Sequence, residues 1–140
     1  MRRGEAPDPR AALVLVPRAL LASSVAILAI AAYVNAEVRP FGSSDLTVIS
    51  WMAVGWAALA PVVATIVRGQ GLVPAPPSQP ESDAELTIRL QKTIVFFGVL
   101  ESGVAFAAAA LMAAPPKWPL VAALFPLAAM ALNLPKRPDA

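Results

Sequence analysis

Residues 82–113, SDAELTIRLQKTIVFFGVLESGVAFAAAALMA, form the stretch from which the fold class can be argued. The first third of this stretch carries charged side chains, namely Asp83, Glu85, Arg89 and Lys92. The rest is apolar or small, except for one carboxylate, Glu101. A helix from Asp83 to the end of this stretch would be about 46 Å long, which exceeds the ~30 Å hydrocarbon core of a bilayer. We therefore expect its first turns to stand in water or at the interface, and residues 90–113 to span the bilayer.

The start of this helix has its own local signal. Ser82 is followed three residues later by Glu85, which is the pattern of a capping box. Glu85 and Arg89 also stand at the favourable i,i+4 spacing. After Ala113, a pair of prolines stops the helix. The sequence therefore predicts one long helix that begins at Asp83.

Composition indicates a membrane protein. The chain has 140 residues, of which 58% are hydrophobic and 14% charged, whereas a soluble domain usually has about 25% charged residues. It contains no Cys and no His, so disulfides, thiol nucleophiles, imidazole ligands and the usual zinc sites are excluded. The net charge of +2 is too small to indicate a nucleic-acid partner. We expect neither a cofactor nor a metal site.

Three further apolar runs complete the predicted fold. They cover residues 13–34, 46–67 and 119–134, and the last is slightly shorter than the ~17–25 residues that usually cross a bilayer. Residues 68–81 contain repeated prolines and should form an extended, solvated spacer. We therefore predict an all-α protein, a single-domain integral membrane four-helix bundle with residues 90–113 as its third span.

Two of these spans have alternatives. The first run could instead be the core of a cleaved signal peptide, because small residues surround Asn35. The acids Glu5 and Asp8 and the length of the run argue against cleavage. The fourth run could be a re-entrant or interfacial segment, since it is short and has Pro126 near its middle. Its lack of charged residues favours a crossing.

The basic residues predict the orientation. Of the 11 Lys and Arg residues, only Arg39 and Lys117 would lie outside if the amino terminus is cytoplasmic, which satisfies the positive-inside rule. Four spans also bring both termini to the same side. Aromatic residues then gather near the outer ends of the spans, namely Tyr33, Phe41, Trp51 and Trp118. We expect a multi-pass protein of the cell membrane with both termini cytoplasmic.

Glu101 is the candidate functional residue, because an acid at the middle of a span is costly unless it is used. A carboxyl group in hydrocarbon favours its protonated form and needs a hydrogen-bond partner. Candidates at this depth are the Trp56 indole, the hydroxyls of Ser23, Ser24 and Ser102, and the carbonyls freed by Pro61 and Pro126. Trp56 is our first choice, since its N–H also needs an acceptor. We therefore predict an ion or proton site made of Glu101, Ser102 and Trp56.

Small residues run along the same helix. Gly98, Ser102, Ala105 and Ala109 fall on one face, at positions i, i+4, i+7 and i+11. Small residues at such spacing let a second helix approach closely. We expect close helix packing at this face, either within the chain or between chains.

Residues 85–101, ELTIRLQKTIVFFGVLE, resemble the loop and second helix of c-type proteolipid subunits of rotary ATP synthases. The matching positions are Glu85, Leu86, Leu90, Gln91 and Thr93. The resemblance implies that Glu101 binds a proton or a sodium ion in the membrane. The interval from Gln91 to Glu101 is one residue shorter here, which turns the acid by about 100° around the helix. The preceding span also lacks the repeated glycines of that family.

These features favour a protein that is not an enzyme. One intramembrane acid with no His, Cys, Asp or Lys near it cannot form an acid–base pair. We predict a structural or accessory subunit that packs helix to helix in a larger membrane complex. Its expected partners are the lipid bilayer and either other membrane subunits or a second copy of the chain. The alternative is a proton- or cation-handling protein that uses Glu101, and a third reading is the binding of a lipid or small molecule between the helices.

Overall fold

The computed structural model describes residues 8–38, 47–69 and 82–136. Within these ranges all regular structure is helical. The elements are α1 (Pro9–Tyr33), the π-helical turn η1 (Val34–Val38), α2 (Thr47–Arg68), α3 (Asp83–Ala113) and α4 (Trp118–Leu132). For the described residues, the predicted all-α class and the four predicted helices are confirmed.

Side-chain hydrogen bonds cap α3 at both of its ends. The predicted capping box is present: the Ser82 hydroxyl accepts a hydrogen bond from the Glu85 amide, and the Glu85 carboxylate accepts one from the Ser82 amide at 2.8 Å. At the far end, the Asn35 side chain of η1 donates to the carbonyl oxygens of Leu111 at 2.7 Å and Ala114 at 3.0 Å. These bonds satisfy carbonyl groups that the end of a helix leaves without partners.

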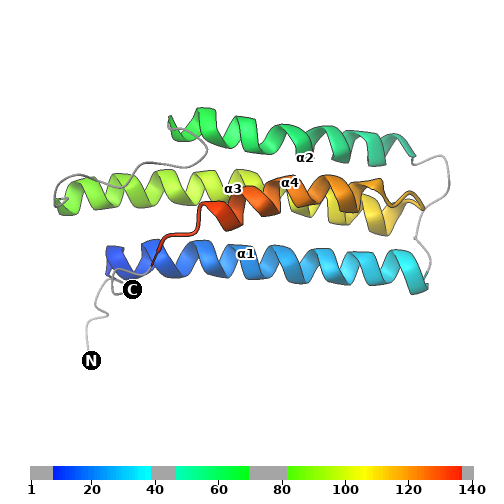
Figure 1. Ribbon diagram of the computed structural model, residues 1–140, viewed down its shortest axis with the longest axis horizontal. Helices are drawn as coiled ribbons and strands as arrows, with labels where there is room; N and C mark the ends of the chain where they lie inside the picture. Colours follow the sequence, from blue (N-terminus) through cyan, green and yellow to red (C-terminus); the bar gives the residue numbers. More distant parts are fainter. Residues whose placement is uncertain (1–7, 39–46, 70–81, 137–140) are drawn as a thin grey trace, which may run out of the picture.

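The long helix α3 is the centre of the bundle. It packs against α1, α2 and α4, and it lies between α1 and α2 in the view of Figure 1. The short helix α4 packs mainly against α2 and α3, with a smaller contact to α1. Three helices therefore surround α3, and part of its circumference is left uncovered.

Small residues allow α2 and α3 to approach each other closely. A Cβ atom added to Gly103 would lie 3.0 Å from the Cβ of Ala60 and 3.5 Å from the Cα of Ala57. On α2 the facing residues are fully buried alanines, namely Ala53, Ala57, Ala60 and Ala64. Such a seam of small side chains brings two helix backbones together and maximises their van der Waals contact.

Three segments of the described residues are long and apolar enough to cross a bilayer: Pro9–Val38, Thr47–Arg68 and Asp83–Ala113. The sequence placed the fourth span at residues 119–134, but α4 has only 15 residues and belongs to the shorter apolar helices. Most of the predicted proline-rich spacer, residues 70–81, lies outside the described residues.

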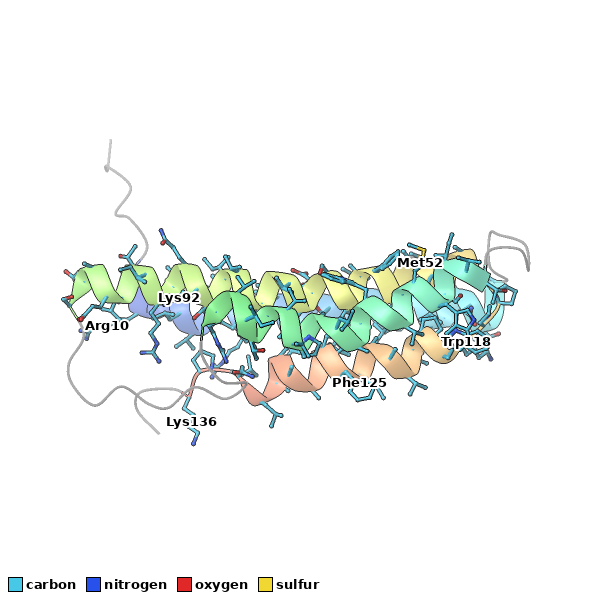
Figure 2. The ribbon with its side chains drawn as sticks, turned by 90° about the horizontal axis from the view of Figure 1, so that it is seen from above. Arg10, Met52, Lys92, Trp118, Phe125 and Lys136 are labelled. Atoms are coloured by element: carbon cyan, nitrogen blue, oxygen red, sulfur yellow. The ribbon has the colours of Figure 1, made fainter. Side chains whose placement is uncertain are left out.

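The two ends of the bundle differ in chemistry. Figure 2 shows Arg10, Lys92 and Lys136 at one end and Trp118 at the other. The rings of Trp51 and Trp118 pack at the second end, with centroids 5.2 Å apart. Basic side chains are thus concentrated at one end of the bundle, and the other end holds the Trp51–Trp118 pair beside a single Lys, Lys117, among the described residues.

Candidate functional site

Glu101 lies in the middle of α3 and is half-buried against α1. Its Oε1 atom accepts a hydrogen bond of 2.9 Å from the Ser23 hydroxyl. The same hydroxyl lies 2.9 Å from the carbonyl oxygen of Leu20, one turn earlier on α1. Ser23 is one of the predicted hydrogen-bond partners of Glu101. The prediction that Trp56 is the partner is wrong.

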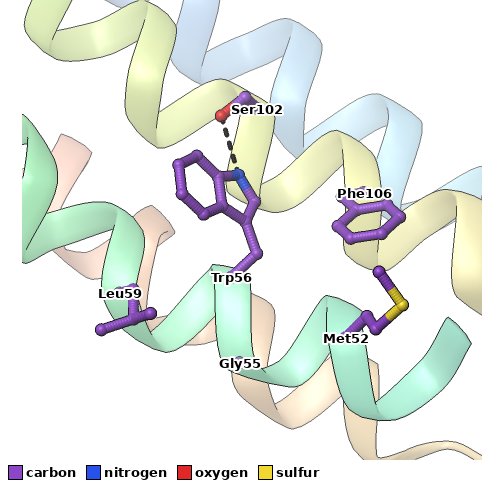
Figure 3. A pocket seen from close by; sticks show the side chains of 6 residues that line it. All are labelled: Met52, Gly55, Trp56, Leu59, Ser102 and Phe106. Atoms are coloured by element: carbon purple, nitrogen blue, oxygen red, sulfur yellow. Dashed lines mark hydrogen bonds between the residues drawn. The ribbon is translucent and has the colours of Figure 1, made fainter. Parts of the chain in front are cut away.

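Trp56 bonds instead to the neighbour of Glu101. The Trp56 indole N–H donates to the Ser102 Oγ at 3.0 Å, as Figure 3 shows. The Ser102 hydroxyl in turn donates to the carbonyl oxygen of Val99 at 2.6 Å. Successive residues of a helix point about 100° apart, so Glu101 faces α1 while Ser102 faces α2. That rotation is why the predicted contact between Trp56 and Glu101 does not form.

Together these side chains make a polar row across three helices, composed of Ser23, Glu101, Ser102 and Trp56. The row contains two separate hydrogen-bonded pairs, one on each side of α3. The three residues of the predicted ion or proton site therefore lie at one level of the bundle. Glu101 is hydrogen-bonded to the serine of α1, whereas Ser102 and Trp56 are bonded to each other.

Between the two pairs, α3 presents an uncovered strip of mostly small side chains. We call this strip the open face; it consists of Val95, Gly98, Ser102, Ala105 and Ala109, all of which are exposed. Nothing lies within 4 Å of a Cβ atom built on Gly98.

The predicted close packing at Gly98, Ser102, Ala105 and Ala109 is therefore absent within the chain. The helix contact uses Gly103 and the neighbouring buried face of α3 instead. Both faces contain small residues, so their spacing does not distinguish the two faces. Packing of the open face against another chain stays a prediction.

A shallow groove of about 640 Å³ borders the open face on the α2 side. Its lining residues are Met52, Gly55, Trp56, Leu59, Ser102 and Phe106, shown in Figure 3. A Cβ atom built on Gly55 would meet nothing within 4 Å. The groove is apolar except for the hydrogen-bonded pair of Trp56 and Ser102.

A second polar cluster, which sequence reasoning missed, closes the end of α4. Arg68, only 6% exposed, donates from Nη1 to the Asn133 Oδ1 at 3.0 Å. Its guanidinium carbon lies 3.8 Å from the centre of the Phe96 ring. From α1, the Arg18 Nη2 lies 3.5 Å from the carbonyl oxygen of Pro135. Two cations thus approach the carboxyl end of α4, where the helix dipole favours positive charge.

The described residues hold no group of three or more His, Cys, Asp or Glu side chains that could bind a metal ion. No protein-family model, curated protein or solved structure matches this chain.

Proposed function

We propose that this chain is a multi-pass protein of the cell membrane that acts as a non-catalytic structural or accessory subunit of a larger membrane complex. Its docking surface is the open face of α3. A transmembrane helix of a partner subunit packs on this face, opposite the side that α4 covers. Both termini lie in the cytoplasm.

The observation that carries the proposal is the exposure of small and polar side chains on the central helix. In a bilayer, small residues are enriched where helices meet, and intramembrane acids usually face another helix or a water-filled cavity. Here Gly98 and Ala105 are exposed and Glu101 is only half-buried. A partner helix on this face removes all three from lipid.

The distribution of charge supports the membrane orientation. Cytoplasmic segments of membrane proteins are enriched in Lys and Arg, and Arg10, Lys92 and Lys136 share one end of the bundle. The other end carries the packed rings of Trp51 and Trp118, as expected of an aromatic belt at the outer interface. The short helix α4 completes an even number of crossings.

Site-specific photocrosslinking in native membranes tests the proposal. A photoreactive phenylalanine analogue at Gly98 or Ala105 should give a crosslinked product of defined mass with another membrane protein. The same analogue at Val121 or Phe125, which are exposed on α4, is the matched control and should give only lipid adducts. Products that are absent from the open face, or equal at both faces, would contradict the proposal.

Proton or cation handling is the second candidate, and the half-buried state of Glu101 favours it. This carboxyl group has one hydroxyl donor among the described residues, Ser23, and Glu101 is the residue that the resemblance to c-type proteolipids implies as the acid, although it is turned by about 100° from the family's position. Labelling of Glu101 by a hydrophobic carbodiimide should then fade as pH rises or as sodium is added. A Glu101→Gln variant that assembles normally and keeps full function would rule this candidate out.

A further inference from the structure

The side chains around the open face also indicate the chemistry of the helix that covers it. We infer that the partner helix belongs to a different protein and carries a cationic side chain, Lys or Arg, at the level of Glu101. This inference rests on the proposed docking at the open face. It adds the identity of the group that the partner must supply.

Glu101 stands at the edge of the open face. Gly98 and Ala105, at i−3 and i+4 from Glu101, are exposed, whereas Phe97 and Val104, at i−4 and i+3, are buried. Residues at these spacings flank one another on a helix surface. The carboxyl group therefore lies on the boundary between the α1 contact and the uncovered strip, within reach of a helix seated on that strip.

Within the described part of the chain, the contacts of the Glu101 side chain do not include a positive charge. In the described part of the chain, its hydrogen-bond partner is the Ser23 hydroxyl. The carbonyl oxygen of Leu20 competes with Glu101 for the same hydroxyl proton. A hydroxyl group carries no net charge. An acid in hydrocarbon is stabilised most by a cation, because electrostatic attraction is strong where the dielectric constant is low.

No cation of the described bundle is placed to serve Glu101. Lys92, the nearest basic residue on α3, is about 14 Å away along the helix axis. The guanidinium groups of Arg18 and Arg68 lie at the end of α4, beside Pro135 and Asn133 respectively. The complementary charge must come from outside these helices.

A second copy of the chain does not supply that group. The same face of a second copy offers Ser102 and Trp56, whose donors already bond to Val99 and to Ser102. It also offers another Glu101, and two carboxylates at one level repel each other. Charge complementarity therefore favours a different protein over a symmetric dimer.

The shape of the surface also fits a helix that carries a cation. The open face lets a helix backbone approach at Gly98, where a Cβ atom would meet nothing within 4 Å. A large apolar side chain of the same helix can occupy the neighbouring groove beside Gly55 and Trp56. A partner helix thus places its cation toward α1 and its apolar side chain toward α2.

Energy transfer between labelled helices in phosphatidylcholine vesicles tests the inference. The purified full chain carries the donor dye, and synthetic Leu/Ala transmembrane helices with Lys, Gln or Leu at the centre carry the acceptor. The Lys-centred helix should associate about tenfold more tightly than the Leu-centred helix, as expected of one good interhelical polar contact. The Gln-centred helix should fall between them.

Variants of the chain then assign the preference to Glu101. Glu101→Gln keeps an acceptor for Ser23 and should abolish the preference for Lys, whereas Asp83→Asn, a change of an exposed acid on the same helix, should retain it. Gly98→Leu should weaken association of all three helices, because it fills the open face. Circular dichroism of each variant verifies that the helices are intact.

Three results would overturn the inference. They are equal association of the Lys- and Leu-centred helices, a Lys preference that persists in Glu101→Gln, and self-association of two labelled copies that the Lys-centred helix does not displace. The crosslinking experiment on Gly98 and Ala105 tests docking at the open face separately from the cation on the partner helix. Crosslinks to another protein without a Lys preference would leave the proposed function in place and remove only the cation.

Discussion

Gly103 of α3 and Ala60 of α2 approach so closely that a Cβ atom on the glycine would lie 3.0 Å from the alanine Cβ. The same added atom would lie 3.5 Å from the Cγ of Pro126 on α4. Three helices meet at Gly103, so a larger side chain at this position would collide with α2 or α4.

Gly103→Leu should therefore destabilise the bundle. Overpacking a tight contact typically costs about 1–3 kcal/mol, and we expect a lower midpoint of thermal unfolding in detergent micelles. Gly98→Leu is the matched control, because a Cβ at Gly98 meets nothing within 4 Å. Equal losses of stability in the two variants would show that the α2–α3 contact is not as close as described.

The contact between Arg68 and Asn133 should stabilise the end of α4. Asn133→Ala removes the acceptor of a hydrogen bond from a buried cation, which typically costs about 1.5–3 kcal/mol. Hydrogen exchange of the last turn of α4 should become faster, while exchange near the start of α4 changes little. Lys136→Ala is the control, since Lys136 is exposed at the same end. Unchanged exchange in Asn133→Ala would mean that the bond contributes nothing to the helix end.

The adjacent serines Ser23 and Ser24 should respond in opposite ways to replacement. The Ser23 hydroxyl donates to Glu101, whereas the Ser24 hydroxyl is buried and has no hydrogen-bond partner among the described residues. Ser23→Ala should weaken the bundle by about 1 kcal/mol, and Ser24→Ala should be neutral or stabilising. Infrared spectra supply a second readout, because loss of the donor should shift the C–O stretching bands of the Glu101 side chain. A shift in Ser24→Ala but not in Ser23→Ala would refute the assigned pair.

Local features of this protein could be predicted from the sequence. The capping box needs only Ser82 and Glu85, which are close in the chain, and both of its hydrogen bonds are present. The helical class follows from the length and apolar character of each run. The level of Glu101 along the bundle could likewise be estimated by counting residues from the helix ends, because the rise per residue is nearly constant.

Features that depend on rotation about the helix axis could not be predicted in this way. Residue counting placed Trp56 and Glu101 at the same level, but the direction of each side chain depends on which helix packs against which face. Small residues occupy both the buried face at Gly103 and the open face at Gly98, so composition did not show which one the chain itself uses. Contacts such as that of Arg68 with Asn133 join residues far apart in sequence and leave no spacing pattern.

The depth of Trp56 provides a test of the membrane arrangement itself. Trp56 lies about 14 Å from the start of α2 and about 18 Å from its end, at ~1.5 Å per residue. If α2 crosses the bilayer, the indole sits near the midplane, while Trp51, one to two turns nearer the end that holds Trp118, sits in the shallower region. Each tryptophan can be observed alone after the other two are replaced by Phe.

Quenching by lipids brominated at different positions along the acyl chain should separate these two residues. The fluorescence of Trp56 should be quenched most by bromines deep in the chain, and that of Trp51 most by bromines close to the headgroup. Since both residues belong to one helix, their relative depths report the direction of α2 independently of any dye or partner. Equal quenching profiles would indicate that α2 lies parallel to the membrane surface, and this would remove the bilayer as the surroundings of Glu101 and the open face.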